Sequence, residues 1–188
     1  MSSGSIDSMV RSWREELPDL DADAMASFAL VHRLSALVRK EVDVLMSDHG
    51  LSTGEFDVLS ALRRAGKPFE MRPAEIASAV MLSPSGMTHR LDLLETAGLI
   101  ERLVDPSNRR TAPARLSKAG QKLVETLVRS HAELLTGLLG EIKPAERRQL
   151  DLLLSKISTT VFETAHSRTQ TILRSPTTAP ELSSAKCA

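Results

Sequence analysis

The 188-residue sequence contains no tyrosine, and four phenylalanines and one tryptophan bring its aromatic fraction to only 3%. Because 41% of the residues are hydrophobic all the same, the core must consist mainly of Leu, Val, Ile, Ala and Met, which favours helices. The single cysteine, Cys187, excludes an internal disulfide and a cysteine-based zinc site. This cysteine usage is typical of a reducing compartment, so we expect a cytoplasmic protein.

Long apolar segments and an excess of one charge sign are also missing. No apolar run approaches about 20 residues, so we expect no membrane-spanning helix and no membrane partner. The first residues lack the apolar stretch of a secretion signal. The 24 Lys and Arg residues are balanced by 24 Asp and Glu residues. Attraction for nucleic acid must therefore be local, and residues 99–122 carry six cations against two carboxylates, a local charge of +4.

Catalytic and metal-binding motifs are missing as well. The sequence has no G-x-S-x-G, G-x-x-x-x-G-K or H-E-x-x-H pattern. The histidines at positions 32, 49, 131 and 166 show no metal-ligand spacing. We therefore expect neither an enzyme nor a protein with a metal or other cofactor.

Helix signals follow one another along the chain. Apolar spacing predicts a short helix over 6–17 and a longer one over 21–49 that Gly50 closes. Ser52 and Glu55 form a capping-box pattern for a helix that ends near residue 66, and residues 67–72 are expected to be a loop. Pro73 and Pro84 suit the first turns of two further helices.

A basic hairpin follows these helices. Residues 99–104 and 111–116 are predicted strands, joined by a turn over 105–110. Pro113 cannot donate to a strand ladder, so we expect the return strand at an edge. Helices are expected from residue 117 to about 140 and again from residue 144. After about residue 174 the sequence is rich in Ser, Thr, Pro and Ala, which predicts a disordered tail.

Two short helices followed by a basic hairpin is the order of a winged helix-turn-helix, a mainly α fold that binds double-stranded DNA. The second helix would read the groove and the wing would reach the adjacent minor groove, where arginine responds to groove width. The predicted DNA contacts are Ser83, Ser85, Thr88, His89, Arg90, Arg109 and Arg110. A merely solvated turn is the alternative for Arg109 and Arg110.

The helices near the two ends carry more leucine than one domain needs, which favours a homodimer over an ordinary bundle within one chain. The expected organisation is an N-terminal extension with a short helix (1–20), a dimerisation helix (21–50), the winged helix-turn-helix region (51–116), C-terminal dimerisation helices (117–174) and a disordered tail (175–188). A two-fold dimer implies a pseudo-palindromic DNA site.

Over residues 20–165 the sequence resembles the MarR family of bacterial transcription regulators. The most specific matches are LDLLETAGLIER at 91–102, the wing residues Asp105-Pro106 and Arg109-Arg110, and LSKAG at 116–120. The resemblance implies a homodimeric winged-helix repressor that releases DNA when a small molecule binds. Asn108 departs from the acidic residue that is more frequent in the family wing.

A finer resemblance links the chain to the urate-responsive PecS-like branch of that family. Trp13, Asp57, Arg90 and Arg102 match the branch in type and local context, and the resemblance implies that they bind urate or a similar anionic purine. The chemistry suits such a ligand, because an indole can stack on a planar ring and guanidinium groups can pair with its charge. Asp57 beside a bound anion would be repelled or would change its protonation.

Several alternatives stay open. Trp13 could instead only pack α-helical segments together. Asp57 and Arg90 could form a purely structural ion pair. Arg102 could contact a phosphate or be an ordinary surface residue. The effector could instead be a phenolic acid or an antibiotic. From another class, a structural helical interaction protein is the alternative, although it would show uninterrupted heptads.

Overall fold

The computed structural model describes residues 4–80, 84–103 and 112–174, with side chains for 6–80, 86–103 and 112–167. The chain divides into two compact units, Met1–Leu138 and Leu139–Ala188, which are considered separately. The predicted disordered tail (175–188) and the predicted turn (105–110) lie outside the described residues.

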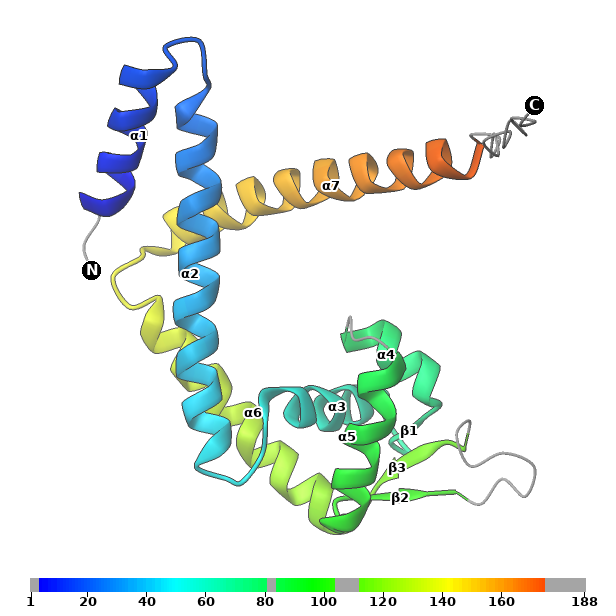
Figure 1. The fold of residues 1–188 in the computed structure, drawn as a ribbon. Coiled ribbons are helices and arrows are strands. Elements are labelled where there is room, and N and C mark those ends of the chain that lie inside the picture. Colours follow the sequence, from blue (N-terminus) through cyan, green and yellow to red (C-terminus); the bar gives the residue numbers. More distant parts are fainter. Residues whose placement is uncertain (1–3, 81–83, 104–111, 175–188) are drawn as a thin grey trace, which may run out of the picture. The chain divides into compact units, whose positions relative to one another are not determined.

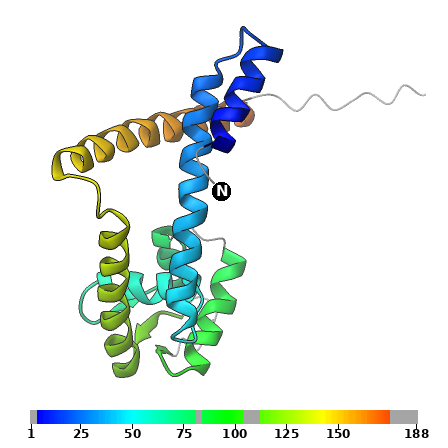
Figure 2. The ribbon, with the colours of Figure 1, turned by 90° about the vertical axis from the view of Figure 1, so that its left-hand side faces the viewer.

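The first two helices confirm the sequence prediction. Helix α1 (Gly4–Glu16) packs on the N-terminal part of α2 (Ala22–Ser47) through Ile6, Val10 and Ala22. The side chain of Asp21 caps α2 by accepting a hydrogen bond from the Ala24 N–H at 3.0 Å. In Figures 1 and 2, α1 runs beside α2 on its N-terminal half.

Helix α3 (Thr53–Arg64) is the central element of the first unit, in contact with α2, α4, α5, α6 and β3. The predicted capping box is present: the Ser52 N–H donates to Glu55 Oε2 at 2.7 Å, and the Glu55 N–H donates to Ser52 Oγ at 3.2 Å. Gly50 has a φ of 70°, the left-handed conformation expected after a helix end.

Helices α4 (Pro73–Val80) and α5 (Pro84–Thr96) begin at the two prolines that predicted their first turns. Met87, Leu91 and Leu94 recur every three or four residues on α5 and are buried. They join a core made by α2 to α6 and the sheet, whose largest members include Met46, Leu59 and Ile76. The helix-turn-helix therefore packs one face of α4 and α5 against an aliphatic core.

Three strands are present within the described residues: β1 (Glu70–Met71), β2 (Ile100–Arg102) and β3 (Ala114–Leu116), antiparallel in the order β1-β3-β2. The β2–β3 pair confirms the predicted wing strands, whereas β1 lies in a segment that was predicted to be a loop. The prediction that the return strand lies at an edge is wrong, because β3 is central. Pro113 immediately precedes β3, so its missing N–H does not interrupt the ladder.

Helix α6 (Lys118–Leu138) returns along α3 and completes the first unit. Ser117 caps it by donating to the Gly98 carbonyl at 2.7 Å and accepting from the Gly120 N–H at 3.0 Å. Gly120 is packed so closely against the Leu99 carbonyl that no Cβ fits there. This contact fixes the start of α6 to the entry of β2.

The second unit contains α7 (Pro144–Arg174), which begins at the predicted proline. Its exposed apolar residues include Leu153, Leu154, Ile157 and Val161, and α2 in the first unit likewise exposes Phe28, Val31, Leu34 and Leu37. Within the described residues, no helix combines the length and apolar character needed to span a membrane.

Candidate functional site

The DNA-reading helix predicted from the sequence is α5. Opposite its buried stripe, His89 is exposed, and Thr88 beside it is half-buried. Ser83 lies outside the described residues, as do Arg109 and Arg110, and the side chain of Ser85 is likewise not described. Of the predicted DNA contacts, the structure thus describes Thr88, His89 and Arg90, all on one helix.

Arg102 on β2 turns toward α5. Its side chain is only 6% exposed, and Nη2 lies 2.7 Å from Asp92 Oδ1. The same nitrogen donates to the Thr88 carbonyl at 3.3 Å, while Nε lies 3.7 Å from Glu95 Oε2. A guanidinium held by two carboxylates is a strong, oriented contact, so Arg102 ties the wing to the reading helix.

Arg90 also turns inward, toward α3. Its Nη1 donates to the Gly86 carbonyl at 3.0 Å, and its Nε is buried without a hydrogen-bond partner among the described residues. The guanidinium lies against Gly54 at the start of α3. Arg90 therefore connects the reading helix to the central helix of the fold.

Asp57 lies on α3 where several elements meet. Burial raises the pKa of its carboxyl, and nearby cations oppose that change. These cations come from four helices: His131 of α6, Arg39 of α2, Arg64 of α3 and Arg90 of α5. A change of charge at Asp57 would thus alter its electrostatic interaction with residues of α2, α6 and the reading helix α5.

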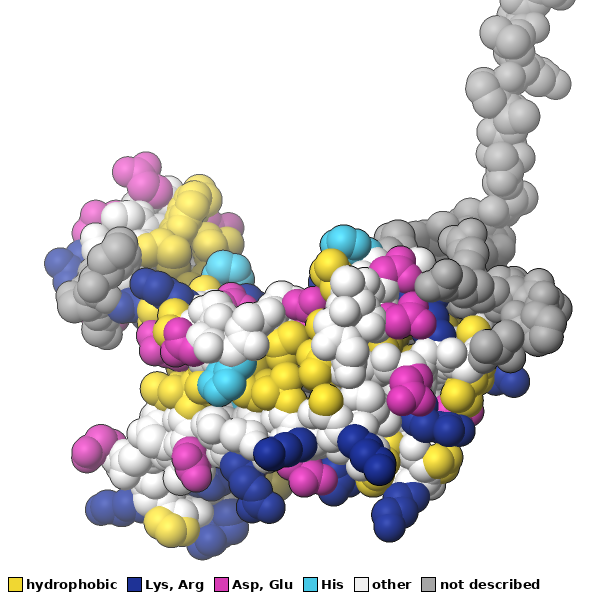
Figure 3. All heavy atoms as spheres, turned by 90° about the horizontal axis from the view of Figure 1, so that it is seen from below, with side chains coloured by type: hydrophobic (Ala, Val, Ile, Leu, Met, Phe, Trp, Pro, Cys, Tyr) yellow, Lys and Arg dark blue, Asp and Glu magenta, His cyan; other side chains and the backbone are white. Residues whose placement is uncertain are grey.

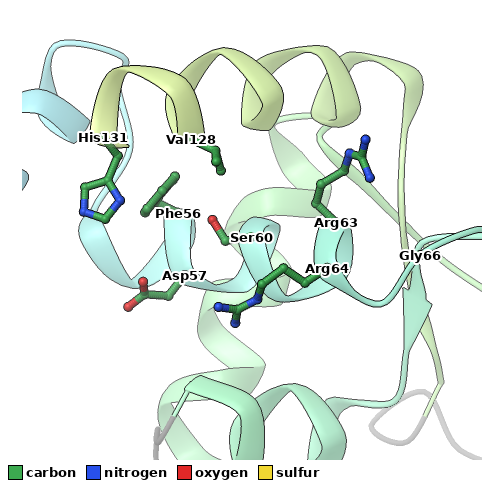
Figure 4. A pocket seen from close by; sticks show the side chains of 8 residues that line it. All are labelled: Phe56, Asp57, Ser60, Arg63, Arg64, Gly66, Val128 and His131. Atoms are coloured by element: carbon green, nitrogen blue, oxygen red, sulfur yellow. The ribbon is translucent and has the colours of Figure 1, made fainter. Parts of the chain in front are cut away.

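A pocket of about 500 Å³ opens beside Asp57, between α3 and α6 (Figure 4). It is lined by Phe56, Asp57, Ser60, Arg63, Arg64, Gly66, Val128 and His131. Phe56 and His131 meet edge to face with ring centroids 5.2 Å apart, and Ser60 Oγ is buried without a hydrogen-bond partner among the described residues. Such a mixture of guanidinium groups, an imidazole, a hydroxyl and an aromatic wall suits a small planar anion.

Arg63, Arg64, Ser60 and His131 were not singled out from the sequence. Asp57, Ser60 and Arg64 are spaced by three and four residues, which places them on one face of α3, as Figure 4 shows. This spacing from Asp57 is the signal by which Ser60 and Arg64 could have been found. His131 comes from α6, far along the chain, and no local pattern connects it with Asp57.

Trp13 is not brought to Asp57 within one chain. It is 38% exposed on α1, and its neighbour Arg14 pairs with Asp23 in the first turn of α2 at 2.7 Å. Asp23 and Arg39 are separated by about 24 Å along the helix axis, at 1.5 Å per residue. The four residues of the predicted ligand site therefore fall into three places: Trp13 on α1, Asp57 near Arg90, and Arg102 on the side of α5 that faces the wing.

Surface charge is dispersed on the face seen in Figure 3, where Lys and Arg side chains form several groups with Asp and Glu between them. Arg63 pairs with Glu125 at 3.0 Å and Arg115 with Glu70 at 2.7 Å, which reduces the local positive field further. In the described part of the chain, no group of three or more His, Cys, Asp or Glu side chains is arranged to hold a metal ion.

Comparison with known proteins assigns this architecture to a family. The MarR family model matches residues 49–111. The transcriptional regulator PecS of Dickeya dadantii (strain 3937) is 34% identical over 152 residues, 81% of this chain and 92% of PecS. The fold is similar to that of AbsC, a MarR family regulator from Streptomyces coelicolor, with a TM-score of 0.67 and 21% identity over 77% of this chain and 97% of AbsC.

A second solved structure, BpsR of Bordetella bronchiseptica, has a TM-score of 0.59 and 25% identity over 69% of this chain and 91% of its own. The DNA binding of BpsR is regulated by 6-hydroxynicotinic acid. These relatives are transcriptional regulators and not enzymes. With PecS matched over most of both sequences and the winged helix-turn-helix present in the structure, the chain belongs to the MarR family of DNA-binding transcriptional regulators and is similar to its PecS-like branch.

Proposed function

We propose that the protein is a cytoplasmic repressor that binds a pseudo-palindromic operator as a homodimer and releases it when urate or a similar anionic purine binds. The observation that carries the effector part is the position of Asp57. Its carboxyl is half-buried beside a pocket and close to cations of four helices, one of which is the reading helix α5.

The DNA contacts proposed are Ser83, Ser85, Thr88, His89 and Arg90 at α5, with Arg109 and Arg110 from the wing. His89 supports this assignment because it is exposed on the side of α5 that faces away from Met87 and Leu91. Arg90 is half-buried against α3, so its contribution to DNA binding requires its side chain to leave that position.

Dimerisation is supported by the exposed apolar residues of α2 and α7. Leaving such faces in water is unfavourable, at about 25 cal/mol per Å² of apolar surface. A second copy of the chain would cover them and would set two α5 helices side by side for two half-sites.

The effector is proposed to enter the pocket beside Asp57, where the Arg64 guanidinium attracts an anion and the His131 ring lines the wall. A bound anion would raise the pKa of Asp57 further, and loss of the aspartate charge would weaken its hold on Arg90. Arg102 could bind the effector only if its guanidinium left Asp92 and Glu95 and paired with the effector instead. Trp13 would have to come from the partner copy or move, since α1 packs at the other end of α2.

The test is the affinity for operator DNA, measured by fluorescence anisotropy with and without urate. We expect urate to weaken DNA binding, by a factor within the usual allosteric range of about 5 to 150. Asp57→Asn should bind urate at least as tightly by calorimetry, because repulsion is removed, while releasing less DNA. Unchanged DNA affinity of the wild-type protein at saturating urate would exclude urate as the effector.

A second effector class is favoured by one comparison. Because the DNA binding of the solved relative BpsR responds to 6-hydroxynicotinic acid, an aromatic carboxylate is the alternative ligand. The same anisotropy experiment with 6-hydroxynicotinate and salicylate separates the two classes. Release by the carboxylates and none by urate would assign the pocket to an aromatic acid.

A further inference from the structure

The position of the Arg90 guanidinium against the start of α3, here called its seat, depends on a glycine at position 54. The Arg90 guanidinium lies over Gly54, and a Cβ at position 54 would be 3.0 Å from both Arg90 Cζ and Nη2 and closer still to Nε. Real Cβ atoms essentially never approach other atoms that closely, so any side chain at position 54 would displace the guanidinium. Gly54 has no positive φ, and its backbone conformation is therefore not the reason for a glycine here.

Gly54 is also a costly choice in energetic terms. A glycine within a helix is less favourable than alanine, because it loses more backbone freedom on folding. Gly137 of α6 offers a comparison, because a Cβ there would meet nothing within 4 Å. Space for a side chain thus exists at one helical glycine and is filled by Arg90 at the other.

Asp57 lies one helical turn after Gly54 on the same helix, so the two positions share a face of α3. Arg90 is among the cations that act on the Asp57 carboxyl. Its Nη1 is at the same time bonded to the Gly86 carbonyl of the reading helix at 3.0 Å. The Arg90 guanidinium therefore connects the reading helix to the face of α3 that carries Gly54 and Asp57.

We infer that Gly54 is a positioning residue: its missing side chain seats Arg90 against α3 beside Asp57, and this seat couples the charge of Asp57 to the reading helix. The coupling part rests on the proposed function, because it concerns the response to an effector. The seat itself does not, and it has a readout that requires neither DNA nor ligand.

The first experiment measures the Asp57 carboxyl titration by NMR in the wild type, Gly54→Ala, Arg90→Ala and the double variant. The pKa of Asp57 should be higher in all three variants than in the wild type, because the cation is displaced or absent. The double variant should match Arg90→Ala. Gly137→Ala, the matched control, should leave the Asp57 pKa unchanged. If the pKa of Asp57 in Gly54→Ala equals the wild-type value, the inference that Gly54 positions Arg90 is wrong.

Folding of Gly54→Ala is checked by thermal unfolding. If that variant fails to fold while the double variant folds, the clash acts through Arg90 and the seat is supported. If both variants fail to fold, Gly54 serves another neighbour and the inference is wrong.

The second experiment measures the ratio of operator dissociation constants with and without urate. We expect a ratio near 1 for Gly54→Ala and Arg90→Ala, with no additional change in the double variant. A wild-type ratio in Gly54→Ala, despite a displaced Asp57 pKa, would refute the coupling. If urate leaves wild-type DNA binding unchanged, the proposed effector fails, and the titration still decides whether Gly54 seats Arg90.

Discussion

Arg102 of β2 and Asp92 of α5 form a 2.7 Å ion pair in which the arginine side chain is 6% exposed and the carboxylate about half exposed. Glu95 and the Thr88 carbonyl complete the contact. The wing strand and the reading helix are therefore joined directly through one guanidinium. These contacts hold α5 against the sheet.

Removal of this guanidinium should lower stability measurably. Arg102→Ala removes the guanidinium that pairs with the Asp92 and Glu95 carboxylates and should cost about 1.5–3 kcal/mol, the usual range for hydrogen bonds to charged groups. For a chain of this size, that corresponds to a fall in Tm of several degrees, at about 2–4 °C per kcal/mol. Thermal unfolding followed by circular dichroism provides the measurement.

The control for Arg102 is Arg14→Ala. Arg14 and Asp23 are as close, at 2.7 Å, but their side chains are 58% and 77% exposed. Exposed pairs contribute about 0–1 kcal/mol, so Tm should barely change. Equal losses of Tm in the two variants would show that burial of Arg102 adds nothing.

The capping box of α3 gives a second prediction about stability. Ser52→Ala removes the acceptor of the Glu55 N–H and should lower the free energy of unfolding by about 1 kcal/mol. Ser52→Thr retains a hydroxyl and should lose less. Urea denaturation measures both, and a cap that matters should give the order wild type, threonine, alanine. An alanine variant as stable as the wild type would contradict the prediction.

Asp57 predicts a specific dependence of stability on pH. Because burial raises its pKa above the ordinary value of 3.8, the folded chain holds the Asp57 proton more tightly than the unfolded chain does. The contribution of Asp57 to stability therefore falls as the pH rises from 3.8 through the folded pKa. Above that range the ionised carboxyl is a net cost to folding.

Asp57→Asn removes this titration while keeping the shape of the side chain. Its free energy of unfolding should exceed that of the wild type at pH 7, and the difference should shrink as the pH falls below 3.8. Urea denaturation across that range provides the measurement. A variant that is less stable than the wild type at pH 7 would mean that the surrounding cations outweigh burial.

Local signals predicted most of the fold. The capping box at Ser52, the prolines at 73 and 84, and Gly50 marked helix boundaries, because caps and turns depend on residues that are close in sequence. Strand β1 was missed because Glu70–Met71 is too short for an alternating pattern and exists only through its pairing with Ala114 and Arg115. The return strand β3 was wrongly predicted at an edge for a related reason, because its pairing with β1 makes it the central strand.

The candidate site depends even more on distant contacts. Asp57 and Arg90 were singled out together, and the structure brings their charges within range. By contrast, the pairing of Arg102 with Asp92 and the approach of Arg90 to Gly54 link separate elements. Such contacts are decided by side-chain packing in three dimensions, which neither periodicity nor motif spacing encodes.

The final prediction concerns the exposed face of α7. Val161 is 53% exposed and shares a helical face with Leu154 and Ile157. If a second copy covers this face, Val161→Asp should bury an unpaired charge and convert the dimer into a monomer, measured as a halved mass by light scattering. Loss of the second half-site should lower operator affinity by about 10²-fold or more.

Thr159→Asp is the matched control, because it replaces a β-branched residue on the opposite face of the same helix with the same charge. It should leave both the mass and the operator affinity as in the wild type. If both variants remain dimeric, α7 does not supply the interface, and the exposed stripe of α2 containing Phe28 and Leu34 would have to pair the two copies alone. If both become monomeric, the change reflects the stability of α7 and not the face that Val161 occupies.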